Sequence, residues 1–120
     1  MELYRYTNVQ EIKFNNFDLL KNIKIKDELV KNNYGFLILY SCDCEHCKDN
    51  VYIWSELSNN FKNFNFFAYN IYDFDNENEK LLQYLSVPNL PRIMNVTKKG
   101  TLNLYKDNCD YDYLFYYINN

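Results

Sequence analysis

Three of the four cysteines in this chain crowd into one short stretch. Cys42, Cys44 and Cys47 fall within six residues, with His46 among them, whereas Cys109 lies far away in the sequence. Disulfides that staple a small fold need cysteines dispersed along the chain, while a cluster more often carries redox chemistry or binds a metal. The cysteine cluster is therefore the first candidate for a functional site.

The spacing of Cys44 and Cys47 suits a thiol–disulfide pair at the start of a helix. After the cysteines, apolar residues recur three or four apart, which predicts a helix that begins near Asp43 or Cys44 and is capped by Asp43 or Ser41. Two cysteines three residues apart on the first helical turn place both sulfurs on one side, close enough to form a disulfide. The apolar stripe is interpreted as core and comprises Val51, Trp54, Leu57 and Phe61.

The start of a helix also predicts which cysteine reacts first. Unpaired backbone N–H groups and the positive end of the helix dipole stabilise a thiolate at Cys44, which makes it nucleophilic near neutral pH. In this hypothesis Cys44 opens a substrate disulfide and forms a mixed disulfide, and Cys47 then displaces the reduced substrate. Oxidation of a substrate runs through the same steps in reverse.

The other thiols leave alternatives open. Cys42, Cys44, His46 and Cys47 offer four metal ligands, but structural zinc sites usually draw ligands from separated segments, and His46 and Cys47 are adjacent. Cys42 is interpreted as a spare thiol at the end of a strand, with a Cys42–Cys44 or intermolecular disulfide as the other choice. Cys109 is expected to be a structural or free thiol.

A buried strand is predicted to lead into the cysteines. Residues 36–40 are apolar on both faces, which is typical of a strand enclosed between two layers of an α/β fold. The acidic residues 73–79 are interpreted as a solvated face, and turns are expected at residues 87–91 and 98–100. Further strands are expected at residues 3–6, 64–72, 92–96 and 101–105, and further helices within residues 17–31 and at residues 78–85 and 110–119.

Composition indicates one globular domain over residues 1–120. Hydrophobic residues make up 48% and charged residues 24%, which is ordinary globular usage. A net charge of -3 argues against a basic nucleic-acid footprint and against binding to an anionic membrane. No apolar run approaches the roughly 18 residues of a membrane span, and the N-terminus lacks the layout of a secretory signal. We therefore expect a cytoplasmic protein, or one of the secretory lumen if a signal segment was removed.

The order of these elements resembles that of the thioredoxin and protein disulfide isomerase superfamily. The shared features are a buried strand, the motif C-E-H-C at residues 44–47, the helix after it, Pro91 ahead of a hairpin, and Gly100 within that hairpin. The resemblance covers roughly residues 34–119. It implies an α/β thioredoxin fold, with helices on both faces of a central mixed five-stranded sheet whose strands lie in the order first, third, second, fourth, fifth.

The resemblance also implies roles for the residues of the motif. Cys44 and Cys47 form the redox-active disulfide. His46 stands where isomerases carry a histidine, and an imidazole beside the Cys44 sulfur makes the disulfide more oxidising; the other interpretation is a solvated loop histidine. Glu45, expected to contact substrate, and Asp43 place like charge near the sulfurs and disfavour the thiolate.

Pro91 corresponds to the proline of this superfamily whose loop packs against the active-site disulfide. The resemblance implies a cis peptide bond there, although cis X-Pro bonds are uncommon in general. Leu90 and Arg92 flank this proline and are expected to border the substrate groove.

Three residues depart from the pattern of the superfamily. Ile38 stands where these proteins bury an acid that helps to take the proton from the second cysteine. Asp43 replaces the usual tryptophan, and Tyr52 stands where a proline usually kinks the helix. We expect slower catalysis, or a substitute proton acceptor in the form of Glu45, Asp43 or a water molecule.

These observations predict a thiol–disulfide oxidoreductase that needs no bound cofactor. Its substrates are expected to be protein disulfides and dithiols, and a reductase or oxidase partner would exchange electrons with it. Two alternatives stay open: a thioredoxin-like binding or assembly module with weak turnover, and a metal-binding redox sensor.

Overall fold

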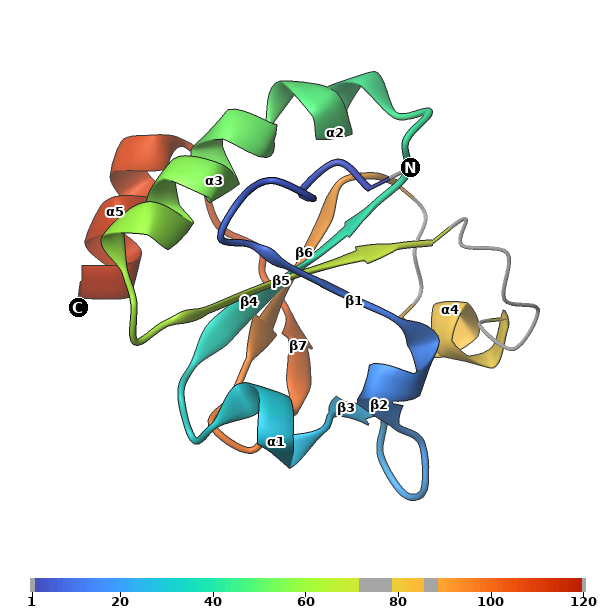
Figure 1. Ribbon diagram of the computed structural model, residues 1–120. Coiled ribbons are helices and arrows are strands. Elements are labelled where there is room, and N and C mark those ends of the chain that lie inside the picture. The colour runs from blue at the N-terminus through green and yellow to red at the C-terminus, as the bar shows by residue number, and fades with distance from the viewer. Residues whose placement is uncertain (1, 72–78, 86–88, 120) are drawn as a thin grey trace.

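The computed structural model describes residues 2–71, 79–85 and 89–119, and a five-stranded mixed sheet lies at its centre (Figure 1). Its strands are, from one edge to the other, β1 (Gln10–Ile12), β5 (Asn65–Asn70), β4 (Gly35–Tyr40), β6 (Arg92–Val96) and β7 (Leu102–Leu104). β1, β5 and β4 run parallel, and β6 and β7 join antiparallel. In chain order this is first, third, second, fourth, fifth, so the predicted sheet is confirmed.

Helices cover both faces of this sheet (Figure 1). On one face lie α2 (Glu45–Asp49), α3 (Val51–Asn60) and α5 (Tyr111–Asn119). On the other lie α1 (Asp27–Val30), α4 (Glu79–Leu85) and a small hairpin of β2 (Phe17–Asp18) and β3 (Lys24–Ile25), preceded by the 3-10 turn η1 (Phe14–Asn16). No helix among the described residues has both the length and the apolar character to cross a bilayer.

Strand β4 is buried along its whole length, as its apolar sequence predicts. Its side chains alternate between two cores. Leu37 and Leu39 pack on the face of α1 and α4, whereas Phe36, Ile38 and Tyr40 pack on the face of α2 and α3. The second core also contains Cys47, Trp54 and Leu57, so the helix after the cysteines is anchored by the apolar stripe that predicted it.

The helix expected within residues 17–31 is wrong for most of that stretch. Phe17 pairs with Ile25 in the β2–β3 hairpin, and only α1 is helical. The hairpin is held by the C-terminal part of the chain, because the Ile25 N–H donates to the Gly100 carbonyl at 3.0 Å. Gly100 has φ +86°, and a Cβ there would clash with the Ile25 carbonyl oxygen. The absence of a side chain at Gly100 therefore allows both the predicted turn and the close approach of β3.

The strand expected at residues 3–6 is also wrong, because these residues form turns and the first strand is β1. The Thr7 N–H donates to the Tyr4 carbonyl at 3.1 Å, which folds the segment back on itself. Tyr4 is nevertheless 1% exposed, since it enters the same core as Cys47. Residues 73–78 of the expected acidic face lie outside the described residues, and so do residues 87–88 of the expected turn at 87–91.

Candidate active site

The cysteine motif lies directly after the central strand β4, at the start of α2 (Figure 1). A tight turn links the two elements, in which the Cys44 N–H donates to the Ser41 carbonyl at 3.1 Å and the Asp43 N–H donates to Ser41 Oγ at 3.2 Å. The helix-capping residue is Cys44 itself, whereas Ser41 stabilises the turn before it. The expected helix start is therefore confirmed, but the expected cap at Asp43 or Ser41 is wrong.

The two sulfurs of the motif lie in different surroundings. Cys44 Sγ accepts a hydrogen bond from the Cys47 backbone N–H at 3.1 Å, so an N–H at the helix start points at the sulfur expected to react first. Cys44 is half-buried, whereas Cys47 is 1% exposed and lies beneath it in the core. All four cysteines fall within the described residues, and none of them is in a disulfide bond.

The surroundings of Cys47 disfavour its thiolate. Burial raises the pKa of the Cys47 thiol to about 12, with hydrogen bonding to the Cys44 side chain and the charge of Cys44 as further causes in the same direction. A backbone hydrogen bond from Ser41 acts in the opposite direction. Cys47 can therefore attack a mixed disulfide only after a proton acceptor has removed its proton.

The charged residues of the motif lie on the solvent side. Asp43, Glu45 and His46 all have exposed side chains, and Glu45 Oε1 pairs with Lys48 Nζ at 3.4 Å. An ion pair this exposed contributes little to stability. The side chains of Glu45 and His46 are thus exposed at the motif, whereas that of Cys47 is buried.

The helix after the cysteines is interrupted at Asn50, which ends α2 and begins α3. The Asn50 N–H donates to the His46 carbonyl at 3.3 Å, and its own carbonyl accepts from Ile53 at 3.2 Å. Tyr52, the residue at the proline position of the superfamily pattern, is exposed and lies within α3, after this interruption. The break lets the short α2 present Cys44 while α3 packs Trp54 into the core.

Pro91 precedes β6, at the end of the sheet from which the cysteine turn departs. The Leu90–Pro91 peptide bond is cis. Leu90 is half-buried and packs against both cores, so it lies at the border of the Cys47 face. Arg92 pairs in register with Leu39, which faces the opposite core. The Arg92 side chain therefore starts on the face away from Cys47, and its Nε atom is buried without a hydrogen-bond partner.

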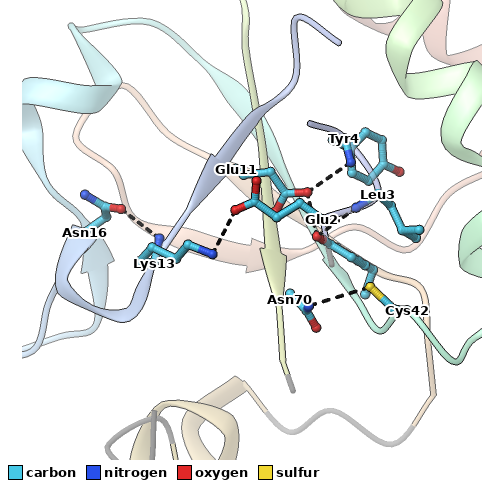
Figure 2. Close-up of polar contacts among 9 residues, drawn as sticks. Glu2, Leu3, Tyr4, Glu11, Lys13, Asn16, Cys42 and Asn70 are labelled. Atoms are coloured by element: carbon cyan, nitrogen blue, oxygen red, sulfur yellow. Dashed lines mark hydrogen bonds and ion pairs between the residues drawn. The ribbon is translucent and has the colours of Figure 1, made fainter. Parts of the chain in front are cut away.

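A half-buried carboxylate on the Cys47 face was missed by sequence reasoning. Glu11 on β1 accepts hydrogen bonds from the Tyr40 hydroxyl at 2.5 Å and from the Tyr4 backbone N–H at 3.1 Å (Figure 2). Burial raises the pKa of the Glu11 carboxyl above its usual range. Glu11 belongs to no sequence motif, and only the pairing of β1 with β5 places it on this face.

Cys42 and Cys109 lie outside the Cys44–Cys47 pair. Cys42 is half-buried and its sulfur lies 3.8 Å from Asn70 Nδ2 at the end of β5 (Figure 2), whereas Cys109 is exposed on the segment before α5. Within the described part of the chain, no group of three or more His, Cys, Asp and Glu side chains could hold a metal ion.

Comparison with solved structures identifies the fold. The chain superposes on the J-Trx1 fragment of ERdj5 with a TM-score of 0.70 at 16% identity, covering 96% of this chain and 52% of that fragment. It matches the short form of spinach chloroplast thioredoxin f with a TM-score of 0.64 at 17% identity, covering 92% and 90% of the two chains. For human ERp44 form II the TM-score is 0.71 at 14% identity, covering 99% of this chain and 31% of that one.

The chain thus spans about half of the ERdj5 fragment and nearly all of the plant thioredoxin. No protein-family model and no curated protein sequence matches it. At these low identities the likeness is one of fold. The chain has a thioredoxin fold, with a Cys44-x-x-Cys47 pair at the start of the helix that follows the central strand.

Proposed function

We propose that this chain is a thiol–disulfide oxidoreductase that exchanges the Cys44–Cys47 pair with protein disulfides and dithiols. The observation that carries the proposal is the asymmetry of the two sulfurs. Cys44 caps a helix, is partly accessible and accepts an N–H hydrogen bond, whereas Cys47 lies buried directly beneath it. One sulfur can meet a substrate while the other waits to resolve the mixed disulfide.

The reduction of a substrate proceeds in two exchanges. The Cys44 thiolate attacks one sulfur of the substrate disulfide, so that bond breaks, the Cys44–substrate bond forms and one substrate thiolate leaves. Cys47 then gives up its proton and attacks Cys44 Sγ, which breaks the mixed disulfide and releases the second substrate thiolate. The dithiol loses two electrons and the substrate disulfide gains them, so no bound cofactor is needed.

Protein partners are proposed to return the Cys44–Cys47 pair to its starting state. A protein reductase would supply two electrons, or a protein oxidase would remove them. Among the structural neighbours, thioredoxin f2 forms a complex with ferredoxin:thioredoxin reductase, which supports a protein partner of this general kind. The match has a TM-score of 0.67 at 18% identity and covers 92% of both chains.

Turnover tests the proposal directly. Steady reduction of insulin disulfides with dithiothreitol as electron source should occur with the wild-type chain and disappear in Cys44→Ser. Cys109→Ser is the matched control, because it removes an exposed thiol from outside the motif, and it should keep wild-type activity. Absence of catalysed reduction above the dithiothreitol background in the wild-type chain would refute the proposal.

The direction of the chemistry is set by the reduction potential of the Cys44–Cys47 pair. A value near about -270 mV indicates a thioredoxin-like reductant, and a value near about -180 mV or higher indicates an isomerase or oxidant. Equilibration in defined glutathione buffers, followed by mass measurement of alkylated thiols, gives this value. We propose a cytoplasmic location if the potential is low, and an oxidising compartment if it is high.

A second candidate is a thioredoxin-like module that binds protein partners with little turnover. Ile38 favours it, because this fully buried side chain offers no acid or base to the cysteine pair. In this case Cys44→Ser would bind the same partners as the wild-type chain, and neither protein would reduce insulin.

A further inference from the structure

A groove lined mainly by aromatic side chains lies away from the cysteine motif. Its volume is about 770 Å³, which falls in the usual range of ligand sites. Gly35, the first residue of β4, lines the groove, whereas the motif follows Tyr40, the last residue of that strand. At about 3.3 Å per residue, the two ends of β4 are roughly 16 Å apart. In the helical layer, α3 lies between α2 and α5, the helix that lines the groove (Figure 1).

Tyrosine rings supply most of the aromatic surface of the groove. Tyr113, Tyr116 and Tyr117 line it from α5, where spacings of three and four residues place them on one side of the helix. Tyr34 lines it from the segment before β4. These four side chains are between 39% and 72% exposed. The Tyr117 ring also stacks on the buried Phe36 ring, with the centroids 5.7 Å apart, so this part of the groove is fixed to the core.

Strands β6 and β7 add amide groups to the same groove. Asn95 and Asn103 both line it and are paired in register, so their side chains point to the same face of the sheet. The Tyr117 hydroxyl donates to Asn95 Oδ1 at 3.1 Å, which engages the amide oxygen, while Asn95 Nδ2 carries two N–H donors. Each polar side chain in the lining is that of Asn, Thr or Tyr and can donate a hydrogen bond. The groove therefore suits an occupant rich in acceptor oxygens.

A lysine gives the rim of the groove a positive charge. Lys98 Nζ lies 5.3 Å from the centroid of the Tyr34 ring, as in a cation–π contact. Among the described residues that line the groove, none is charged. Asp112 precedes Tyr113 on α5 and has an exposed side chain. These charges favour an acidic group of an occupant beside Tyr34 and disfavour one beside Tyr113.

The exposed aromatic surface suits a short segment better than a second folded protein. At about 200 Å² for each aromatic side chain, the exposed fractions of the four tyrosines amount to roughly 400 Å². A stable protein pair buries about 800 Å² on each partner. The tyrosines thus supply about half of the surface that a stable dimer of this chain needs.

A proline-rich segment has the chemistry that these features require. Proline offers a backbone carbonyl but no N–H, so such a segment needs donors from its binding site and few acceptors. In the polyproline II conformation the carbonyls have no internal hydrogen bonds. Aromatic-lined grooves bind such segments, and the preformed conformation limits the entropy lost on binding.

We propose that the groove between α5 and strands β6 and β7 binds a proline-rich segment of a protein partner. The proline rings pack on the tyrosines, the amide groups of Asn95 and Asn103 donate to backbone carbonyls, and an acidic residue of the segment pairs with Lys98. This activity goes beyond the proposed disulfide exchange and does not depend on it. Because the groove lies at the opposite end of β4, a partner held there leaves Cys44 accessible.

NMR titration of the nitrogen-15-labelled full chain tests the proposal. The probe is an acetylated decaproline peptide that ends in two glutamates, and the control peptide has alanine in place of each proline. The proline peptide should shift the backbone amide resonances of Tyr34, Asn95, Asn103 and Tyr116, whereas the alanine peptide should leave them in place. The shifts give the dissociation constant for each variant.

Two matched pairs of variants test the contacts. Tyr116→Ser should weaken binding of the proline peptide about tenfold, since an aromatic contact is lost. Tyr52→Ser is its control, because Tyr52 is 70% exposed against 72% for Tyr116 and lies on α3 outside the groove lining. Lys98→Gln should weaken binding about two- to fivefold, and Lys99→Gln should weaken it less. With glutamine in place of the peptide's glutamates, Lys98→Gln should have no effect.

Several results would overturn the inference. They are equal shifts with the alanine peptide, no shift of the groove resonances at about 2 mM proline peptide, and equal losses in Tyr116→Ser and Tyr52→Ser. Groove resonances that move on dilution of the protein without peptide would show that a second copy occupies the groove, and would overturn it too. Equal losses in Lys98→Gln and Lys99→Gln would overturn the pairing with Lys98.

The binding test is independent of disulfide chemistry. Cys44→Ser should bind the proline peptide as the wild-type chain does, because the cysteine motif lies outside the groove lining. Failure to reduce insulin would contradict the proposed function and leave the binding result as it stands. Loss of peptide binding in Cys44→Ser would contradict a site separate from the motif.

Discussion

Cys47 should resist alkylation far more strongly than an ordinary thiol. With a pKa of about 12, its thiolate fraction at pH 8 is about 10⁻⁴, against about a quarter for a free cysteine of pKa about 8.5. A more basic thiolate is also more nucleophilic, which recovers about 40-fold of this roughly 2,000-fold deficit. Alkylation of Cys47 should therefore be about 50-fold slower than that of a cysteine peptide, before its 1% exposure slows it further.

The assay is timed alkylation of the reduced protein with iodoacetamide at pH 8, followed by peptide mass analysis. Guanidinium-unfolded protein is the control, because all cysteines should then react at the peptide rate. In Cys44→Ser the charge of Cys44 is gone but burial, the largest cause of the raised pKa, remains. Cys47 should therefore stay slow in this variant. Alkylation of Cys47 within fivefold of the peptide rate, in either protein, would refute the reasoning.

Three further predictions concern stability. Gly100→Ala should lower the free energy of unfolding by about 2 kcal/mol or more in urea titrations, because φ is +86° and the new Cβ meets the Ile25 carbonyl; an unchanged midpoint would contradict this. Asn65→Ala should cost roughly 1–3 kcal/mol, since Asn65 Nδ2 donates to the buried Val30 carbonyl at 2.7 Å; Asn63→Ala, at an exposed position, is the control. Burial raises the pKa of the Glu11 carboxyl, so the folded protein favours the protonated form. The stabilisation that the protonated carboxyl contributes is lost as pH rises through the raised pKa. Glu11→Gln should therefore raise Tm relative to wild type at pH 8 and lose this advantage near pH 4, and a difference that does not change with pH would count against a raised pKa.

The sequence alone was enough to predict the central features of the site. Residues 36–40 are apolar on both faces, and this local pattern correctly predicted the buried strand that became β4. The helical spacing of Trp54 and Leu57 predicted a helix that buries both residues. Spacing also identified Cys44 and Cys47, because a C-x-x-C pair at a helix start is encoded by neighbouring residues.

Tertiary structure decided the features that depend on distant partners. The residues around Phe17 and Ile25 have apolar spacing that also fits a helix, and contact with the backbone of Gly100 selects the hairpin. The face on which Arg92 begins follows from its register with Leu39. A one-residue change of register moves every side chain of a strand to the opposite face, and no local pattern fixes that choice for short strands.

Glu11 shows the same limit at the site itself. In the sequence it is one carboxylate among 16 acidic residues, 36 positions before Cys47. The pairing of β1 with β5 places Glu11 on the face of the sheet where the core contains Cys47. Tyr4, in the folded N-terminal segment, donates its backbone N–H to Glu11 and packs its side chain into that core. The sequence determined which sulfurs can react, because their chemistry and spacing are local. Only the tertiary structure placed a half-buried carboxylate on their side of the sheet, because strand register is set by packing between segments far apart in the chain.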